Sequence, residues 1–161
     1  MQNKFEAYLR ANGAASTAHS GKSLWSHLSG VQHILQAAGC APYLCTAGLF
    51  HSIYGTQSFK KVIINASQRS EVQALIGQQA EHLVWAFSHL ARPALFEASL
   101  QTNDFGWLDA ITTPDTQWQF WQDLAQLECA NLLEQRCLHQ FPRLARYAQQ
   151  VRMLDREGFL V

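Results

Sequence analysis

The sequence has few charged residues and no excess of either sign. Only 15% of its 161 residues are charged, and twelve basic residues balance twelve acidic ones. A chain without a basic excess has no field that attracts nucleic acid or anionic lipid, so neither is expected as a partner. No apolar run approaches the roughly 18 residues that cross a bilayer, so no membrane segment is expected either.

The sequence also lacks the closely paired cysteines of a zinc knuckle or a redox motif. Its four cysteines are Cys40, Cys45, Cys129 and Cys137, and none of them forms a Cys-x-x-Cys pair. Reduced and mostly buried thiols are therefore expected, as in a cytoplasmic protein. The N-terminal stretch MQNKFEAYLRANG is polar and amphipathic, which does not fit a signal peptide.

Helical periodicity runs through nearly the whole chain. With 48% hydrophobic residues, the composition suits one domain with a sizeable core. We predict an all-α, single-domain fold over residues 1–161, and a small β-hairpin near residues 99–113, where turn residues gather. Aromatic residues 118, 120 and 121 are expected in the core or at an oligomer interface. The predicted helices span residues 2–12, 24–38, 42–53, 71–76, 78–90, 116–138 and 142–157, with residues 59–67 ambiguous between helix and extended chain.

Several polar side chains fall on the apolar faces of these helices. His27, His51 and Asn131 do so on three different helices, Gln135 follows Asn131 by one turn, and Glu81 lies at the border of its apolar stripe. Burying such a group unsatisfied costs about 1–3 kcal/mol. We therefore expect His27, His51 and Asn131 to converge on one another, on other polar groups, on water or on a metal.

Five short motifs give the chain a family resemblance. HLSGVQHIL begins at His27, and AGLFHS follows with His51 placed 24 residues later. EVQALIG, QAEHLVWAF and LECANLLEQ come next, in that order. This series resembles the HD superfamily of metal-dependent phosphohydrolases over residues 22–138, with a layout similar to the hydrolase domain of the stringent-response (p)ppGpp enzymes. It also resembles an uncharacterised family of small HD-like proteins.

The resemblance implies a helical fold and two histidine metal ligands, at His27 and His51. It also shows two departures. Ser52 stands where the family has the Asp of its His-Asp pair, and Asn131 stands where the last Asp would be. Two-metal hydrolysis needs a bridging group that holds the ions about 3.5–4 Å apart. Because both carboxylates are missing, a dinuclear site built from the family's ligands is not expected.

Three interpretations of the two histidines remain open. In the first, one divalent transition metal such as Zn, Fe or Ni binds both imidazoles, and Glu81, Asp109 or water completes the coordination. In the second, the histidines belong to a metal-free pocket that binds a small polar molecule. In the third, the polar cluster only fixes the helix packing, since Asn and His side chains can satisfy each other.

The resemblance points to a hydrolase or lyase acting on a small polar substrate. His27, His51 and Glu81 are the candidate catalytic residues, because imidazole titrates near neutrality. The competing class is a non-catalytic ligand-binding or scaffold domain with a degenerate HD site. The candidate substrate-binding residues are Ser52, Tyr54, Arg92, Asn131 and Gln135.

Overall fold

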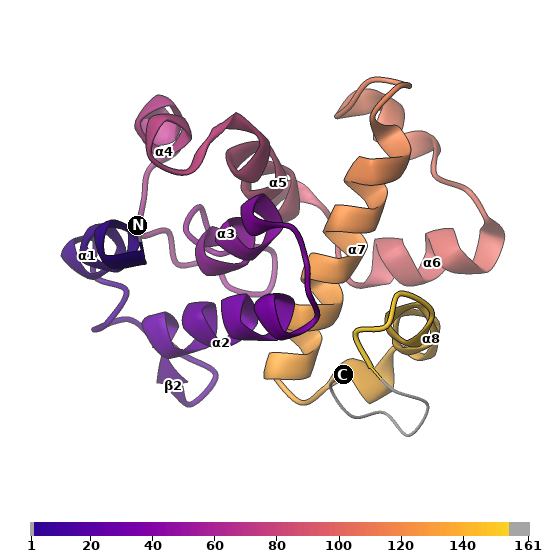
Figure 1. Cartoon of the computed structure of the whole chain (residues 1–161), viewed down its shortest axis with the longest axis horizontal. Helices are drawn as coiled ribbons and strands as arrows, with labels where there is room; N and C mark the ends of the chain where they lie inside the picture. The colour runs from indigo at the N-terminus through magenta and orange to yellow at the C-terminus, as the bar shows by residue number, and fades with distance from the viewer. Residues whose placement is uncertain (1, 155–161) are drawn as a thin grey trace.

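The structure, a computed structural model, describes residues 2–154. Its helices within that range, drawn in Figure 1, are α1 (Gln2–Ala11), α2 (Leu24–Ala37), α3 (Pro42–Phe50), α4 (Arg69–Ile76), α5 (Gln78–His89), α6 (Ala94–Thr102), α7 (Gln117–Glu134) and α8 (Pro142–Gln150). Short 3-10 helices lie at Ala66–Gln68, Gly106–Ala110 and Leu138–Gln140. One antiparallel strand pair, β1 (Ala18–His19) with β2 (Lys22–Ser23), precedes α2. The predicted all-α single domain is confirmed.

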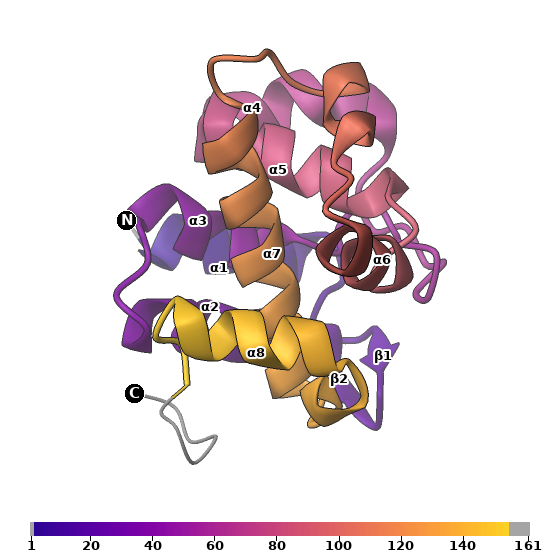
Figure 2. The same ribbon diagram turned by 90° about the vertical axis from the view of Figure 1, so that its right-hand side faces the viewer.

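Helix α7 is the central element of the fold. Figures 1 and 2 show it passing between a group that holds α2, α3 and α5 and a second group formed by α6 and α8. A helix with neighbours on opposite sides must be apolar over most of its surface. Accordingly, Leu124, Leu127 and Ala130 are fully buried in α7. The buried polar residues of this helix, Asp123, Glu128 and Asn131, therefore lie inside the domain and need partners there.

Helices α2 and α3 pack closely because a glycine lies at their contact. A Cβ atom at Gly48 would lie only 2.5 Å from Leu35 Cδ1 and 3.4 Å from a methyl group of Val31. Only glycine lets the two backbones approach this far without displacing a side chain. The close packing brings the C-terminal end of α3 against the N-terminal half of α2, where the two histidines lie.

Helix α2 begins as predicted. The Ser23 hydroxyl accepts a hydrogen bond from the backbone N–H of Ser26 at 3.2 Å, which caps the first turn. The start predicted for α4 is wrong. Its first residue is Arg69 rather than Glu71, because a 3-10 turn capped by Asn65 runs directly into the helix.

The predicted hairpin near residues 99–113 is wrong. Residues 94–102 form α6, and residues 106–110 form a 3-10 turn. The turn residues instead end α6, with Asn103 in the left-handed conformation at φ 55°. Phe96 of α6 stacks on Trp107 of the turn, with ring centroids 5.8 Å apart, so aromatic packing favours this compact arrangement over an extended one.

The last two helices are shorter than predicted. Helix α7 stops at Glu134, and Arg136 then turns the chain with φ 58°. Helix α8 stops at Gln150, and the end of the predicted helix, residues 155–157, lies outside the described residues. The apolar periodicity continues past both stops, but the chain turns there, with Arg136 and Arg152 in the left-handed conformation.

The structure also tests the predictions about the cysteines, the aromatic residues 118–121 and membrane segments. All four cysteines are free, with Cys45 and Cys129 buried and the other two half-buried. Of the aromatic cluster, Trp121 is fully buried in the core, whereas Trp118 is 62% exposed. Among the helices of residues 2–154, none has the length and apolar character needed to cross a membrane.

Candidate functional site

Two buried histidines meet in the core. His27 lies in α2 and His51 follows α3, and their side chains are 0% and 1% exposed. Their Nε2 atoms are 3.0 Å apart. The predicted convergence of these two histidines is therefore confirmed. A contact between two identical ring nitrogens raises the question of which of them carries hydrogen.

The opposite nitrogens of the two rings have defined partners. His51 Nδ1 lies 2.7 Å from the carbonyl oxygen of Gly48. A carbonyl only accepts, so His51 Nδ1 carries the hydrogen, and the Nε2 of the neutral ring presents its lone pair. His27 Nδ1 lies 2.5 Å from Glu134 Oε2, a carboxylate oxygen that also requires a donor. Both rings are thus held through Nδ1, and both Nε2 atoms point at each other.

Two lone pairs at this distance repel, so a proton or a cation between the Nε2 atoms relieves the contact. Burial lowers the pKa of His51 well below its usual range. Burial also lowers the pKa of His27, while the hydrogen bond to Glu134 acts in the opposite direction. A proton shared between the rings therefore depends on the Glu134 carboxylate, which stabilises the charged form of His27.

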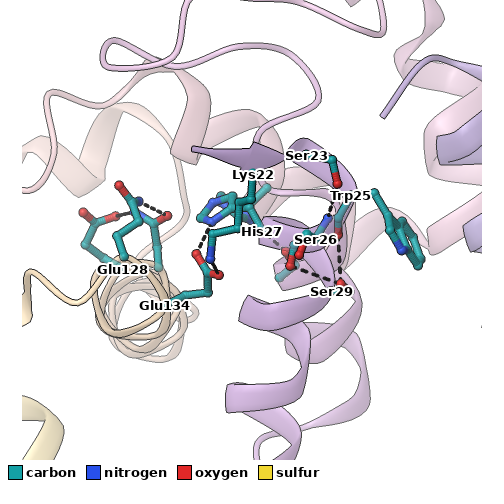
Figure 3. Close-up of polar contacts among 12 residues, drawn as sticks. Lys22, Ser23, Trp25, Ser26, His27, Ser29, Glu128 and Glu134 are labelled. Carbon is teal, nitrogen blue, oxygen red and sulfur yellow. Dashed lines mark hydrogen bonds and ion pairs between the residues drawn. The ribbon is translucent and has the colours of Figure 1, made fainter. Parts of the chain in front are cut away.

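Glu134 reaches His27 because α2 has no side chain in its way. A Cβ at Gly30 would lie 2.9 Å from Glu134 Cγ, so glycine at this position leaves room for the carboxylate to cross from α7. Glu134 also forms an ion pair with Lys22 of β2, as Figure 3 shows. Burial alone would raise the pKa of Glu134, but the hydrogen bonds from Lys22 and His27 lower it.

A cavity of about 240 Å³ lies beside the histidine pair. Its wall includes four of the predicted substrate-binding residues, namely Ser52, Arg92, Asn131 and Gln135. His27 and His51 lie behind this wall rather than in it. His19 of β1 lines the cavity and lies against the pair, with its ring centroid 4.1 Å from that of His27.

Arg92 and Glu128 form a buried ion pair in the cavity wall. Arg92 Nη1 donates to Glu128 Oε2 at 2.8 Å, and the side chains are 6% and 0% exposed. The guanidinium also lies over the Phe87 ring, 3.6 Å from its centroid. Burial raises the pKa of Glu128, and the nearby Arg92 opposes that shift.

Two residues that line the cavity each have a buried atom without a hydrogen-bond partner among the described residues. These atoms are Glu128 Oε1 and His19 Nε2. The neighbouring amides are engaged elsewhere, since Gln135 Nε2 donates to Asn131 Oδ1 at 2.8 Å and Asn131 Nδ2 lies 3.5 Å from Glu128 Oε2. An unpartnered buried polar atom costs about 1–3 kcal/mol, and more if it is charged.

A family model described as a domain of unknown function, DUF6817, matches residues 8–92, more than half of the chain. The chain belongs to this family. No curated protein and no solved structure matches it. The DUF6817 segment holds both histidines of the pair and Arg92, whereas Glu128 and Glu134 lie beyond it on α7. The site is thus built from the DUF6817 segment and from the C-terminal half of the chain.

Glu81 and Tyr54 lie inside the DUF6817 segment but do not join the histidines. The Glu81 carboxylate accepts four hydrogen bonds, from Tyr54 Oη at 3.0 Å, from Arg69 Nε and Nη2 at 2.7 and 2.9 Å, and from Gln73 Nε2 at 3.0 Å. A carboxylate has about four lone-pair positions, so all of them are used. This fully bonded cluster ties α4 to α5 and to Tyr54.

Asp109 is also remote from the pair. It is exposed in the 3-10 turn after α6, where it accepts a hydrogen bond from Gln117. Glu81 and Asp109, the two carboxylates predicted as further metal ligands, therefore both have their contacts away from the histidine pair.

Three residues of the site were missed by sequence reasoning: His19, Glu128 and Glu134. Both glutamates lie in the LECANLLEQ stretch, three residues before and three residues after Asn131. That spacing places them close to its helical face, and this signal could have identified them. His19 lies in a two-residue strand with no periodic pattern, so nothing in the sequence indicated its position.

The donor set fits a metal only in part. A metal-binding histidine usually donates its second ring N–H to a carboxylate or a carbonyl, and both His27 and His51 have such a partner. However, residues 2–154 contain no group of three His, Cys, Asp or Glu side chains that could hold a metal. The dinuclear centre implied by the HD resemblance therefore does not fit, and a single ion would have two protein ligands of these types.

Proposed function

We propose that the protein binds a small polar molecule in the cavity between α7, the α3–α4 connection and the β1–β2 hairpin. The observation that carries this proposal is the wall of that cavity, where Glu128 Oε1 and His19 Nε2 are both buried without a partner among the described residues. A bound molecule with polar groups at matching positions would satisfy both atoms. Burying these two atoms without a partner costs free energy, and a ligand that supplies the missing hydrogen bonds removes this cost and so binds more tightly.

The size and composition of the cavity suit a small ligand. Its volume of about 240 Å³ falls below the roughly 300–1,000 Å³ of drug-sized pockets. Hydroxyl and amide side chains from four separate segments face it, among them Ser52, Thr56, Ser58 and Gln140. Phe59 and Phe141 form an apolar part of the cavity wall. Such a mixture is typical of a site that recognises a molecule by hydrogen bonds around a small apolar body.

An HD-like architecture is part of the same proposal. It is supported by the pairing of His27 with His51 and by the presence of Ser52 and Asn131, the two positions that depart from the HD pattern, in one cavity wall. Because both imidazoles of the pair lie behind the cavity wall, hydrolase or lyase chemistry would need a water molecule or another group to carry the proton from the cavity to them. The four free thiols are consistent with a cytoplasmic protein.

A substitution at the mouth of the cavity tests the proposal. Ser58 is exposed and lines the cavity, so Ser58→Trp should block it without disturbing a buried group. The neighbouring Gln57 is exposed and lies outside the wall, which makes Gln57→Trp the matched control. We expect small polyols, amides, amino acids or nucleosides that raise the melting temperature of the parent to do so in Gln57→Trp but not in Ser58→Trp. Equal responses of the two variants would contradict the proposal.

A single transition metal at the histidine pair is the second candidate function. It is favoured by the 3.0 Å separation of the Nε2 atoms, each on a ring held through Nδ1. Zn²⁺ or Ni²⁺ should then stabilise the parent by about 2.7 kcal/mol at a hundred times its dissociation constant. His89→Gln, at an exposed histidine, should respond equally, and His27→Gln should not. No metal-dependent change in the parent would exclude this candidate.

A further inference from the structure

The charges in the cavity wall sum to zero. Arg92 and Glu128 are the only Lys, Arg, Asp or Glu residues that line the cavity in the described part of the chain, and they pair with each other. The Cys137 thiol is uncharged, because burial raises its pKa.

The two members of the pair are not equally satisfied. Arg92 donates from Nη1 to Glu128 Oε2 and from Nε to the Phe87 carbonyl at 3.1 Å, and its guanidinium lies over an aromatic ring. Its positive charge is thus already matched. Glu128, in contrast, is fully buried, and its Oε1 has no partner within residues 2–154. Glu128 Oε1 is therefore an acceptor that still lacks a donor, and the described residues of the wall hold no spare positive charge.

Resting on the proposed function, we propose that the molecule bound in this cavity is uncharged and donates a hydrogen bond from an amide N–H or a hydroxyl group to Glu128 Oε1. A phosphate or carboxylate group would meet a buried carboxylate with no free cation among the described wall residues to offset the repulsion. A cationic ligand would give the cavity a net positive charge, whereas the charges of Arg92 and Glu128 now balance. The inferred class thus differs from the phosphate substrates implied by the HD resemblance.

Acetamide and acetate test this inference, because they have almost the same shape and differ in charge. Each would be titrated into the ¹⁵N-labelled full chain at pH 7, up to about 50 mM since very small ligands bind weakly. Ethylene glycol is added as an uncharged probe with hydroxyl donors, so that hydroxyl and amide donors can be compared. Inorganic phosphate is added as a second anion. The side-chain amide signals of Asn131 and Gln135 report on the cavity. We expect acetamide or ethylene glycol to bind at least about tenfold more tightly than acetate or phosphate.

Glu128→Gln should reverse the preference. The variant removes the negative charge and leaves the Arg92 cation unmatched, so acetate should gain at least about tenfold over acetamide. If this variant does not fold, the comparison of ligands in the parent decides alone, with Ser58→Trp as the blocked control. Tighter binding of acetate or phosphate than of acetamide in the parent, abolished by Ser58→Trp, would overturn the inferred class but keep the proposed cavity function. No response of the cavity signals to any of the four probes would overturn both.

Discussion

Arg92→Met should lower the free energy of unfolding by about 3–5 kcal/mol, the usual cost of breaking a buried ion pair from one side. The variant leaves Glu128, which is fully buried, without its cation. Met retains much of the apolar volume of the arginine stem, so most of the loss should come from the uncompensated charge. Chemical denaturation of the variant and the parent at pH 7 measures the difference.

The pH dependence of this loss follows from Glu128. Burial raises the pKa of Glu128 in the folded protein, and the variant removes the Arg92 charge that opposes this shift. A carboxyl group whose pKa is higher in the folded state contributes its full stability below its unfolded pKa, near 4.3, and loses it as the pH rises. The deficit of Arg92→Met should therefore be small near pH 4 and grow toward pH 8.

Two further variants control this experiment. Arg143→Met removes an exposed arginine that lies 3.6 Å from Glu97, and it should cost no more than about 1 kcal/mol. Arg92→Met combined with Glu128→Leu should recover most of the loss, because replacing both members by apolar residues is often neutral. A deficit in Arg92→Met that does not change with pH, or that the double variant does not relieve, would mean that the buried charge is not its cause.

The double variant Ser52→Asp with Asn131→Asp should lose stability at pH 7 and regain it with Mn²⁺. Both positions line one cavity, and both side chains are nearly fully buried. In the metal-free protein, each new carboxyl costs about 1.4 kcal/mol for every unit by which burial raises its pKa. The carboxylate introduced at position 131 would also lie beside Glu128, whose Oε2 is 3.5 Å from the present Asn131 amide.

Mn²⁺ should reverse this loss because it offsets the new negative charge and carboxylates are hard ligands for such an ion. A Mn²⁺ concentration a hundred times the dissociation constant would raise the free energy of unfolding of the double variant by about 2.7 kcal/mol. Melting temperatures with and without Mn²⁺ show both effects, and the two single variants test whether both carboxylates are needed. The parent should respond little. A double variant that gains no metal-dependent stability would show that positions 52 and 131 do not face a common site.

The starts of α2 and α3 followed from local sequence, whereas α6 did not. Apolar periodicity and the Ser23 cap correctly located α2, and Pro42 in the first turn correctly located α3. These signals act within one or two turns of chain, so they can be read without knowing the fold. The same periodicity placed His27 and His51 on buried faces, which is why their meeting was predicted.

The partners of the buried polar groups depended on tertiary packing. Glu134 lies 107 residues from His27 in sequence and reaches it only because Gly30 leaves space between α2 and α7. Glu81 has the right helical phase to face inward, yet Arg69, Gln73 and Tyr54 use all its acceptor positions. The position of a residue on a helix face predicts the direction of its side chain, but it does not predict which side chain of another element that group contacts.

The sequence by itself therefore determined that the chain is helical and that His27, His51 and Asn131 turn into its interior. The tertiary structure decided that the two imidazoles meet through Nε2, that Glu128 rather than Glu81 borders the cavity, and that a short hairpin brings in His19. The physical reason is the range of the forces involved. Backbone hydrogen bonds and apolar periodicity act locally, whereas a buried charge is satisfied by whichever distant group the helix packing brings within about 3 Å of it.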